Sequence, residues 1–217
     1  NLQQYGAAYV FRANCSTNMT TCTNRRWSQE AQLFPVPDLG TSGDMFGAAA
    51  AINDEGDVIV IGAPGGENSR GHVYIYQYED HDGDGHFRWE LHQRILIEAT
   101  SNGDQAGWSV GIFGNTLVFG VPKLGGTGAL YVFKRASKSS QFKQNQDLLP
   151  SQTVYPLQSG DLYGYSLAII ELYLAVGAPG RDDACTYRGR VANPSEDDTG
   201  AVFVFIRSST ALPFTFL

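Results

Sequence analysis

The chain has 217 residues, of which 42% are hydrophobic and 12% aromatic, so a folded globular protein is expected and a disordered one is excluded. Its 15 basic and 22 acidic side chains give a net charge of −7 without any basic stripe, which argues against nucleic acid or an anionic membrane as the main partner. No apolar run approaches the roughly 18 residues of a membrane span, and the first residues, NLQQYGAAYV, lack an initiator Met and a signal-peptide pattern. We therefore expect a mature protein or a piece of one.

The N-terminal part combines two cysteines with two glycosylation sequons. Cys15 and Cys22 lie seven residues apart, and the sequons begin at Asn14 and Asn18. No His or further Cys lies nearby to complete a metal site, so the pattern predicts a short disulfide loop in a secreted glycoprotein. Two free thiols and two unused sequons are the open alternative. Cys185 has no evident partner in the sequence.

A repeated unit organises the rest of the chain. Each copy opens on a Gly-Asp turn, and the copies begin at Gly43, Gly103 and Gly160, 60 and then 57 residues apart. A strand of small residues follows, then an apolar run that ends in Gly-Ala/Val-Pro, and then a glycine with an aromatic-rich strand. These last strands read GHVYIY, GALYVF and GAVFVF, and a further copy, GAAYVF, stands near the N-terminus at 6–11. The chain therefore opens partway through a unit.

The patterning of each unit predicts four antiparallel strands. The second run is apolar at every position, as expected of a strand buried on both faces. The last strand alternates polar and apolar residues over 87–96, as a half-exposed strand does. Four short strands per unit without a convincing helix are typical of β-propeller blades, so we predict an all-β propeller built of four-stranded antiparallel blades. The predicted parts are the last two strands of a blade at 1–42, blades at 43–102 and 103–159, and a blade, complete or not, at 160–217.

The repeat resembles the FG-GAP repeat of integrin α-chain propellers and related extracellular proteins. Phe46-Gly47 stands as the FG and Gly62-Ala63-Pro64 as the GAP, with modest departures in the later copies. The resemblance implies a seven-bladed ring, of which about three and a half blades are present. Such a half-ring is either a fragment or closes its edges on another copy, because long exposed edges aggregate. We favour the fragment.

An acidic segment follows the third strand of the first unit. Asp80, Asp82 and Asp84 alternate before Gly85, as in the first half of an oxygen-rich Ca²⁺ loop. Positions nine and twelve are Arg88 and Leu91, where a closing oxygen ligand would be wanted, so a solvated hairpin turn is the alternative. The family's own calcium loops, between first and second strands, do not carry over because those connections are too short here.

The loop after the third GAP, 181–199, is far longer than its counterparts, and long loops on a rigid scaffold are frequent binding elements. By resemblance it lies on the face where integrins engage ligands, alongside the Gly-Asp turns, and a tolerated surface insertion is the alternative. The candidate ligand-binding residues are Arg181, Asp182, Asp183, Tyr187, Arg188 and Arg190.

No catalytic constellation is predicted. The segment GWSVG fits a serine-hydrolase pattern, but its Ser109 aligns with strand residues of the other copies and the strand-turn-helix context is missing. We therefore expect an extracellular, non-enzymatic propeller that binds a protein or glycan in adhesion or matrix assembly. Two alternatives are a building block of an extracellular filament or coat, and an accessory domain of a larger secreted enzyme.

Overall fold

The computed structural model describes residues 5–14, 26–35, 43–80, 82–150, 156–181 and 200–217. Their fold is all-β, and every sheet is antiparallel. A two-stranded sheet, β1-β2, precedes three four-stranded sheets whose strands pair in chain order, β3-β4-β5-β6, β7-β8-β9-β10 and β11-β12-β13-β14. The strands are β1 Ala8–Asn14, β2 Arg26–Leu33, β3 Ala49–Ile52, β4 Val58–Ala63, β5 His72–Glu79, β6 Arg88–Ile95, β7 Ser109–Phe113, β8 Thr116–Val121, β9 Ala129–Lys134, β10 Lys143–Asp147, β11 Ser166–Ile169, β12 Tyr173–Ala178, β13 Ala201–Ile206 and β14 Thr215–Phe216.

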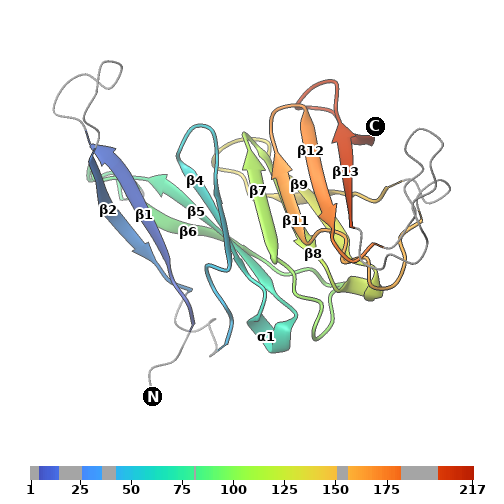
Figure 1. Cartoon of the computed structure of the whole chain (residues 1–217). Coiled ribbons are helices and arrows are strands. Elements are labelled where there is room, and N and C mark those ends of the chain that lie inside the picture. Colours follow the sequence, from blue (N-terminus) through green and yellow to red (C-terminus); the bar gives the residue numbers. More distant parts are fainter. Residues whose placement is uncertain (1–4, 15–25, 36–42, 81, 151–155, 182–199) are drawn as a thin grey trace.

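The sheets stand side by side in chain order as an open fan (Figure 1), and the first strands of neighbouring sheets, β3, β7 and β11, contact one another. This arrangement is that of blades in a partial β-propeller, as predicted. Helical structure in the described residues is limited to single turns, α1 (Gly66–Ser69) and η1 (Leu124–Gly126), which follow the GAP segments.

Apolar side chains between the sheets form the core. The second strands β4 and β8 are buried along their whole length, which confirms the expectation from their apolar sequences. One cluster joins sheets β3–β6 and β7–β10 through Val60, Val73 and Phe119. Another joins sheets β7–β10 and β11–β14 through Val118, Leu130 and Phe203. The core therefore lies between blades as much as within them, and a blade depends on its neighbours for stability.

The strands of the three blades end at two opposite faces of the fan (Figure 1). The Gly-Asp face carries the turns at Gly43-Asp44, Gly103-Asp104 and Gly160-Asp161, at the bottom of Figure 1. The hairpin face, at the opposite end, carries the turns β3–β4, β7–β8 and β11–β12. The first junction is the contact between sheets β3–β6 and β7–β10, and the second junction is the contact between β7–β10 and β11–β14.

Candidate functional site

The FG and GAP glycines meet across each junction. A Cβ on Gly62 would lie 1.9 Å from the Gly107 carbonyl oxygen, and a Cβ on Gly120 would lie 1.9 Å from that of Gly164. Only glycine permits so close an approach of two backbones. Within each blade, the same FG glycine donates its N–H to the GAP glycine carbonyl, as from Gly107 to Gly120 at 3.1 Å. The two motifs are therefore one joint that links consecutive blades.

Each Gly-Asp turn is held by the same local geometry. The residue between Asp and the FG pair is Met45, Gln105 or Leu162, and each has a left-handed φ of 58°, 65° or 55°. This conformation is uncommon for residues other than glycine and is kept only where surrounding contacts enforce it. In the later two turns the Asp carboxylate accepts an N–H from three residues before, as from Ser101 to Asp104 at 2.6 Å. The Gly-Asp face is thus built on preorganised backbone.

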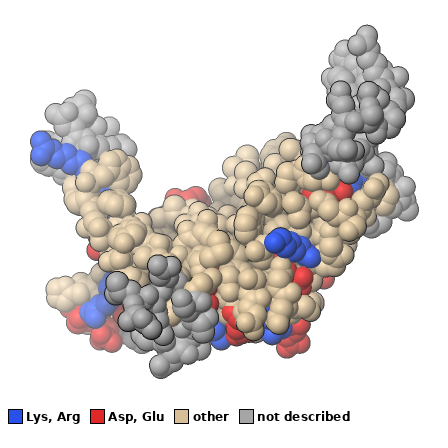
Figure 2. All heavy atoms as spheres, turned by 60° about the horizontal axis from the view of Figure 1, so that its bottom comes forward, with Lys and Arg blue, Asp and Glu red and all other residues tan. Residues whose placement is uncertain are grey.

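Aromatic side chains project at the start of the inner strands on this face. Trp108 and Tyr165 directly follow their FG glycines, and their rings lie 5.3 Å apart at 47°. Trp108 is half-buried, Tyr165 is 42% exposed, and Met45 on the first turn is 47% exposed. Figure 2 shows that most of the surface seen from this side belongs to uncharged residues, with charged side chains in small separate groups. Exposed aromatic groups on a rigid frame are suited to contact a protein or a sugar.

Arg181, the first predicted ligand-binding residue, is buried at 3% exposure. Its guanidinium donates to the Asp161 carboxylate at 2.8 Å and to the Pro156 carbonyl at 3.0 Å. Arg181 therefore anchors the start of the long loop to the third Gly-Asp turn, which is a packing role. Asp182, Asp183, Tyr187, Arg188 and Arg190 lie outside the described residues, and their role in binding stays a prediction.

The acidic turn after β5 is closed by its own backbone and an arginine. Asp80 accepts N–H groups from Asp84 and Gly85, at 3.1 and 2.9 Å. Asp82 and Asp84 pair with Arg88, the latter at 2.6 Å. The backbone N–H of His86, followed by the guanidinium of Arg88, lowers the pKa of Asp84. Within the described residues, no group of three or more His, Cys, Asp or Glu side chains is arranged to hold a metal ion. These contacts are those of a hairpin turn closed by its own side chains, and calcium binding by Asp80, Asp82 and Asp84 stays a prediction.

Of the predicted glycosylation and disulfide residues, the structure describes Asn14. It ends β1, is exposed, and its amide donates to Ser28 at 2.5 Å. Asn18, Cys15 and Cys22 lie outside the described residues. Ser109 is 9% exposed and donates to the Gly164 carbonyl at 2.7 Å, so its hydroxyl belongs to the second junction.

The hairpin face carries two buried arginines that the sequence reasoning missed. Arg135 follows β9 and Arg207 follows β13. Each donates backward to the preceding blade, Arg135 to Gln77 at 3.4 Å and Arg207 to Thr116 at 2.9 Å. Each also stacks on an aromatic ring of its own blade, Phe142 or Phe214. The sequence signal for these arginines was a basic residue at the same position, directly after the aromatic strand, in two successive units.

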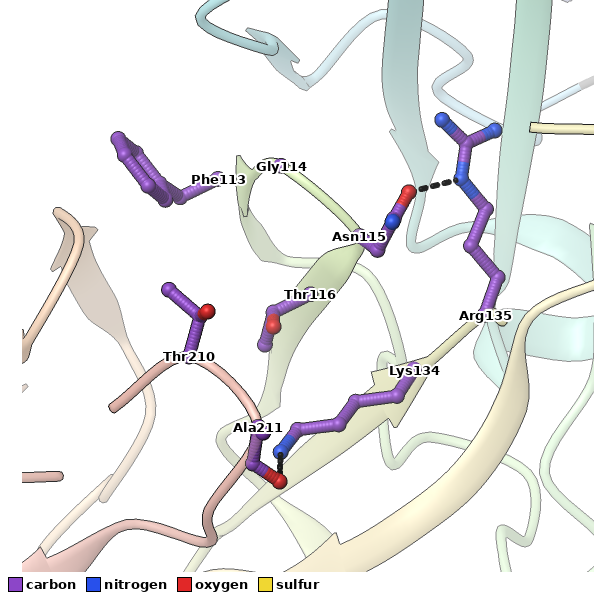
Figure 3. A pocket seen from close by; sticks show the side chains of 8 residues that line it. All are labelled: Phe113, Gly114, Asn115, Thr116, Lys134, Arg135, Thr210 and Ala211. Carbon is purple, nitrogen blue, oxygen red and sulfur yellow. Dashed lines mark hydrogen bonds between the residues drawn. The ribbon is translucent and has the colours of Figure 1, made fainter. Parts of the chain in front are cut away.

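A pocket of about 340 Å³, lined in part by Arg135, opens between the β7–β8 turn and the segment after β13 (Figure 3). Its lining residues are Phe113, Gly114, Asn115, Thr116, Lys134, Arg135, Thr210 and Ala211. The Lys134 ammonium donates to the carbonyls of Ala211 and Leu212 at 3.2 and 3.0 Å. Burial, followed by the charge of Arg207, lowers the pKa of Lys134. The pocket is thus basic.

Comparison with known proteins agrees with the geometry of the joints. The FG-GAP repeat family matches residues 27–76, which include the first FG and GAP segments. No curated protein matches the chain. Among the described residues, no helix has the length and apolar character to cross a membrane. The chain therefore contains an FG-GAP repeat at residues 27–76, and joints of the same FG–GAP geometry recur at both junctions between its antiparallel blades.

Proposed function

We propose that the chain is part of a non-enzymatic extracellular propeller that binds a protein or a glycan in cell adhesion or matrix assembly. The observation that carries the proposal is the aromatic pair Trp108–Tyr165 on the Gly-Asp face, at a ring distance of 5.3 Å. FG-GAP repeats are typical of extracellular binding propellers, which is consistent with this role.

The chemistry of the Gly-Asp face supports binding. The two aromatic residues directly precede the adjacent inner strands β7 and β11, whose starts are fixed by the FG glycines and the left-handed turn residues. A ligand would therefore meet rings that are already ordered, and little conformational entropy would be lost on binding. Aromatic side chains that become buried when a ligand binds commonly contribute about 2 kcal/mol or more to an interface.

A binding assay with paired variants tests the proposal. The whole chain is immobilised and presented with a panel of purified matrix proteins and defined oligosaccharides. The W108A and Y165A variants should each lose at least about tenfold in affinity for whichever panel member binds. The control is Ile170→Ala, because Ile170 is 61% exposed at the other end of the same strand, on the hairpin face. Equal losses in all three variants, or binding unaffected by W108A and Y165A, would contradict the proposal.

Secretion is tested separately from binding. Expression through a eukaryotic secretory route should give a product whose mass falls on enzymatic deglycosylation, with sugar on Asn14 or Asn18. Cys15 and Cys22 should resist a thiol reagent until a reductant is added. An unglycosylated product with both thiols free would argue against the extracellular part of the proposal.

A further inference from the structure

The two junctions carry equivalent positions on the hairpin face, and these positions differ in charge. The strand register shows which positions correspond. Val58 pairs with Gln77 in the first blade, and Thr116 pairs with Lys134 in the same way in the second. The residues before these strand starts, Asp57 and Asn115, correspond in the same way.

The first junction neutralises its own basic group. Lys138 reaches from the second blade into the β3–β4 turn, where Asp57 and Glu55 each lie 2.5 Å from its ammonium. These hydrogen bonds raise the pKa of Lys138 and lower that of Asp57 despite the partial burial of the carboxylate. Positive and negative groups are therefore balanced at this junction by side chains of the protein.

The second junction has the basic group without the carboxylates. Asn115 stands where Asp57 stands, Thr210 replaces Lys138, and Lys134 replaces the neutral Gln77. Among the described residues, Lys134 makes no ion pair, and its two hydrogen bonds go to backbone carbonyls. One carboxylate touches this turn from outside the pocket lining, since Asp54 accepts the Gly114 N–H at 2.9 Å.

A second cation, Arg207, contacts two of the residues that line the pocket. Arg207 is 1% exposed and donates to Thr116 and to the Thr210 carbonyl, both of which belong to pocket-lining residues. One of its terminal nitrogens has no hydrogen-bond partner among the described residues. Burial lowers the pKa of Arg207, and the charge of Glu171 only partly offsets this. Two basic side chains thus share a partly buried region, and each disfavours the charge of the other.

The lining can supply donors to a ligand. The third ammonium proton of Lys134 remains after its two carbonyl contacts, and Asn115 uses its carbonyl oxygen to accept from Arg135 at 2.8 Å, which leaves its amide N–H groups available. Figure 3 shows the side chains of Thr116 and Thr210 near the end of Lys134, while the amide of Asn115 and the guanidinium of Arg135 lie together on the other side of β8. These groups surround an open volume of about 340 Å³.

We propose that this pocket binds a small oxyanion, that is, a carboxylate, sulfate or phosphate group, held by Lys134 and the threonine hydroxyls, with Asn115 at the rim of the site. The anion takes the place that Asp57 and Glu55 occupy at the first junction. The site lies on the hairpin face and is independent of the binding role assigned to the Gly-Asp face.

The chain itself supplies the variants for the test. Lys134→Gln introduces the residue of the first junction and removes the charge, while Asn115→Asp introduces the first junction's carboxylate and keeps Lys134. Sodium sulfate, phosphate and acetate are titrated into the whole chain at constant ionic strength and followed by amide NMR shifts. Wild type should give saturable shifts centred on residues 113–116 and 207–212 with at least one anion. Both variants should bind that anion about tenfold or more weakly, since a charge-assisted contact is lost in one and opposed in the other.

A variant away from the pocket serves as the control. Val202→Ala, at a 69% exposed position of the last described blade, should leave anion binding unchanged, and circular dichroism should show that both pocket variants remain folded. A further arm compares inorganic sulfate with glucosamine 6-sulfate. Tighter binding of the sugar would assign the anion to a sulfated glycan, and equal binding would assign it to a free ion. Absence of saturable shifts, or shifts that persist unchanged in Lys134→Gln and Asn115→Asp, would overturn the proposal.

Discussion

Gly120 and Gly177 occupy the same GAP position in successive blades, yet their surroundings differ. A Cβ on either glycine would meet a serine hydroxyl, that of Ser109 at 2.5 Å or of Ser166 at 2.3 Å. Only Gly120 would also meet a backbone oxygen of another blade, that of Gly164 at 1.9 Å. The GAP glycine is therefore required by the neighbouring blade rather than by the strand in which it lies.

The exposure of side chains at the second junction and on the last described blade also depends on the neighbouring blade. Leu130 at the second junction is 0% exposed, while its counterpart on the last described blade, Val202, is 69% exposed. The strand β12 alternates between buried and more exposed positions, although β4 and β8, with similar sequences, are buried throughout. A blade's local sequence specifies strands and turns, and the adjoining blade decides how deeply they are buried.

The largest effect is expected inside the last blade, where an ion pair holds the Gly-Asp turn. Arg181→Ala should lower the free energy of unfolding by about 3 kcal/mol or more, because it leaves the 2% exposed Asp161 carboxylate without its cation. Denaturant unfolding measures the loss. Gly66 and Leu124 occupy the corresponding place in the other blades, so the effect should be specific to this blade. A change below about 1 kcal/mol would mean that the pair is no stronger than a surface ion pair.

The comparison of the two glycines predicts the next largest effect. Gly120→Ala should cost about 3 kcal/mol, since the clash is with backbone that can move only if the blades separate. Gly177→Ala should cost less than about 1 kcal/mol, because the Ser166 hydroxyl can rotate away. Unfolding curves of the two variants provide a matched pair. Equal losses would show that strand geometry, and not the neighbouring blade, requires the glycine.

A smaller, pH-dependent effect is expected at the first junction. His72 is 1% exposed, and burial lowers its pKa below the usual 6.5, with Arg94 acting in the same direction and Glu67 and Asp44 against it. Below about pH 6.5 the unfolded chain takes up a proton that the folded chain resists. Stability should therefore be full above that pH and fall as the pH drops toward the lowered folded pKa. His72→Ala, which introduces the residue found at 129 and 201, should flatten the unfolding free energy between pH 7 and 5. A slope retained in this variant would place the titration elsewhere.

The smallest effect is expected at the acidic turn, far from the junctions. Because its carboxylates already accept backbone amides and pair with Arg88, Ca²⁺ should not raise the melting temperature measurably over that in a chelator. Differential scanning calorimetry of the whole chain, once with Ca²⁺ and once with a chelator, measures the two melting temperatures. A rise that disappears in Asp82→Asn would restore the calcium interpretation.

Much of the fold could be predicted because the local sequence pattern of each unit indicates its strands. The apolar run at 58–63 and the aromatic strand at 72–79 form neighbouring strands as their patterns indicate, and glycine and proline mark where they end. The resemblance on the FG and GAP segments also pointed correctly to the FG-GAP repeat.

The candidate sites could not be predicted to the same extent, since they depend on contacts between units. Arg181 reads as a loop residue, but its burial comes from Asp161, twenty positions earlier. The pocket beside Lys134 joins a β7–β8 turn to residues that follow β13, and no local pattern connects those segments. Charge differences between aligned repeat positions would have been the signal to examine.

The backward reach of the buried arginines gives the assembly of the blades a direction. Gln77 obtains the hydrogen bond from Arg135 only when the second blade is present, and Thr116 obtains that from Arg207 only with the third. During synthesis from the N-terminus, each blade would emerge with its rim incomplete and be finished by the blade that follows it. The order of translation is thus also the order in which the polar contacts of the hairpin face are completed.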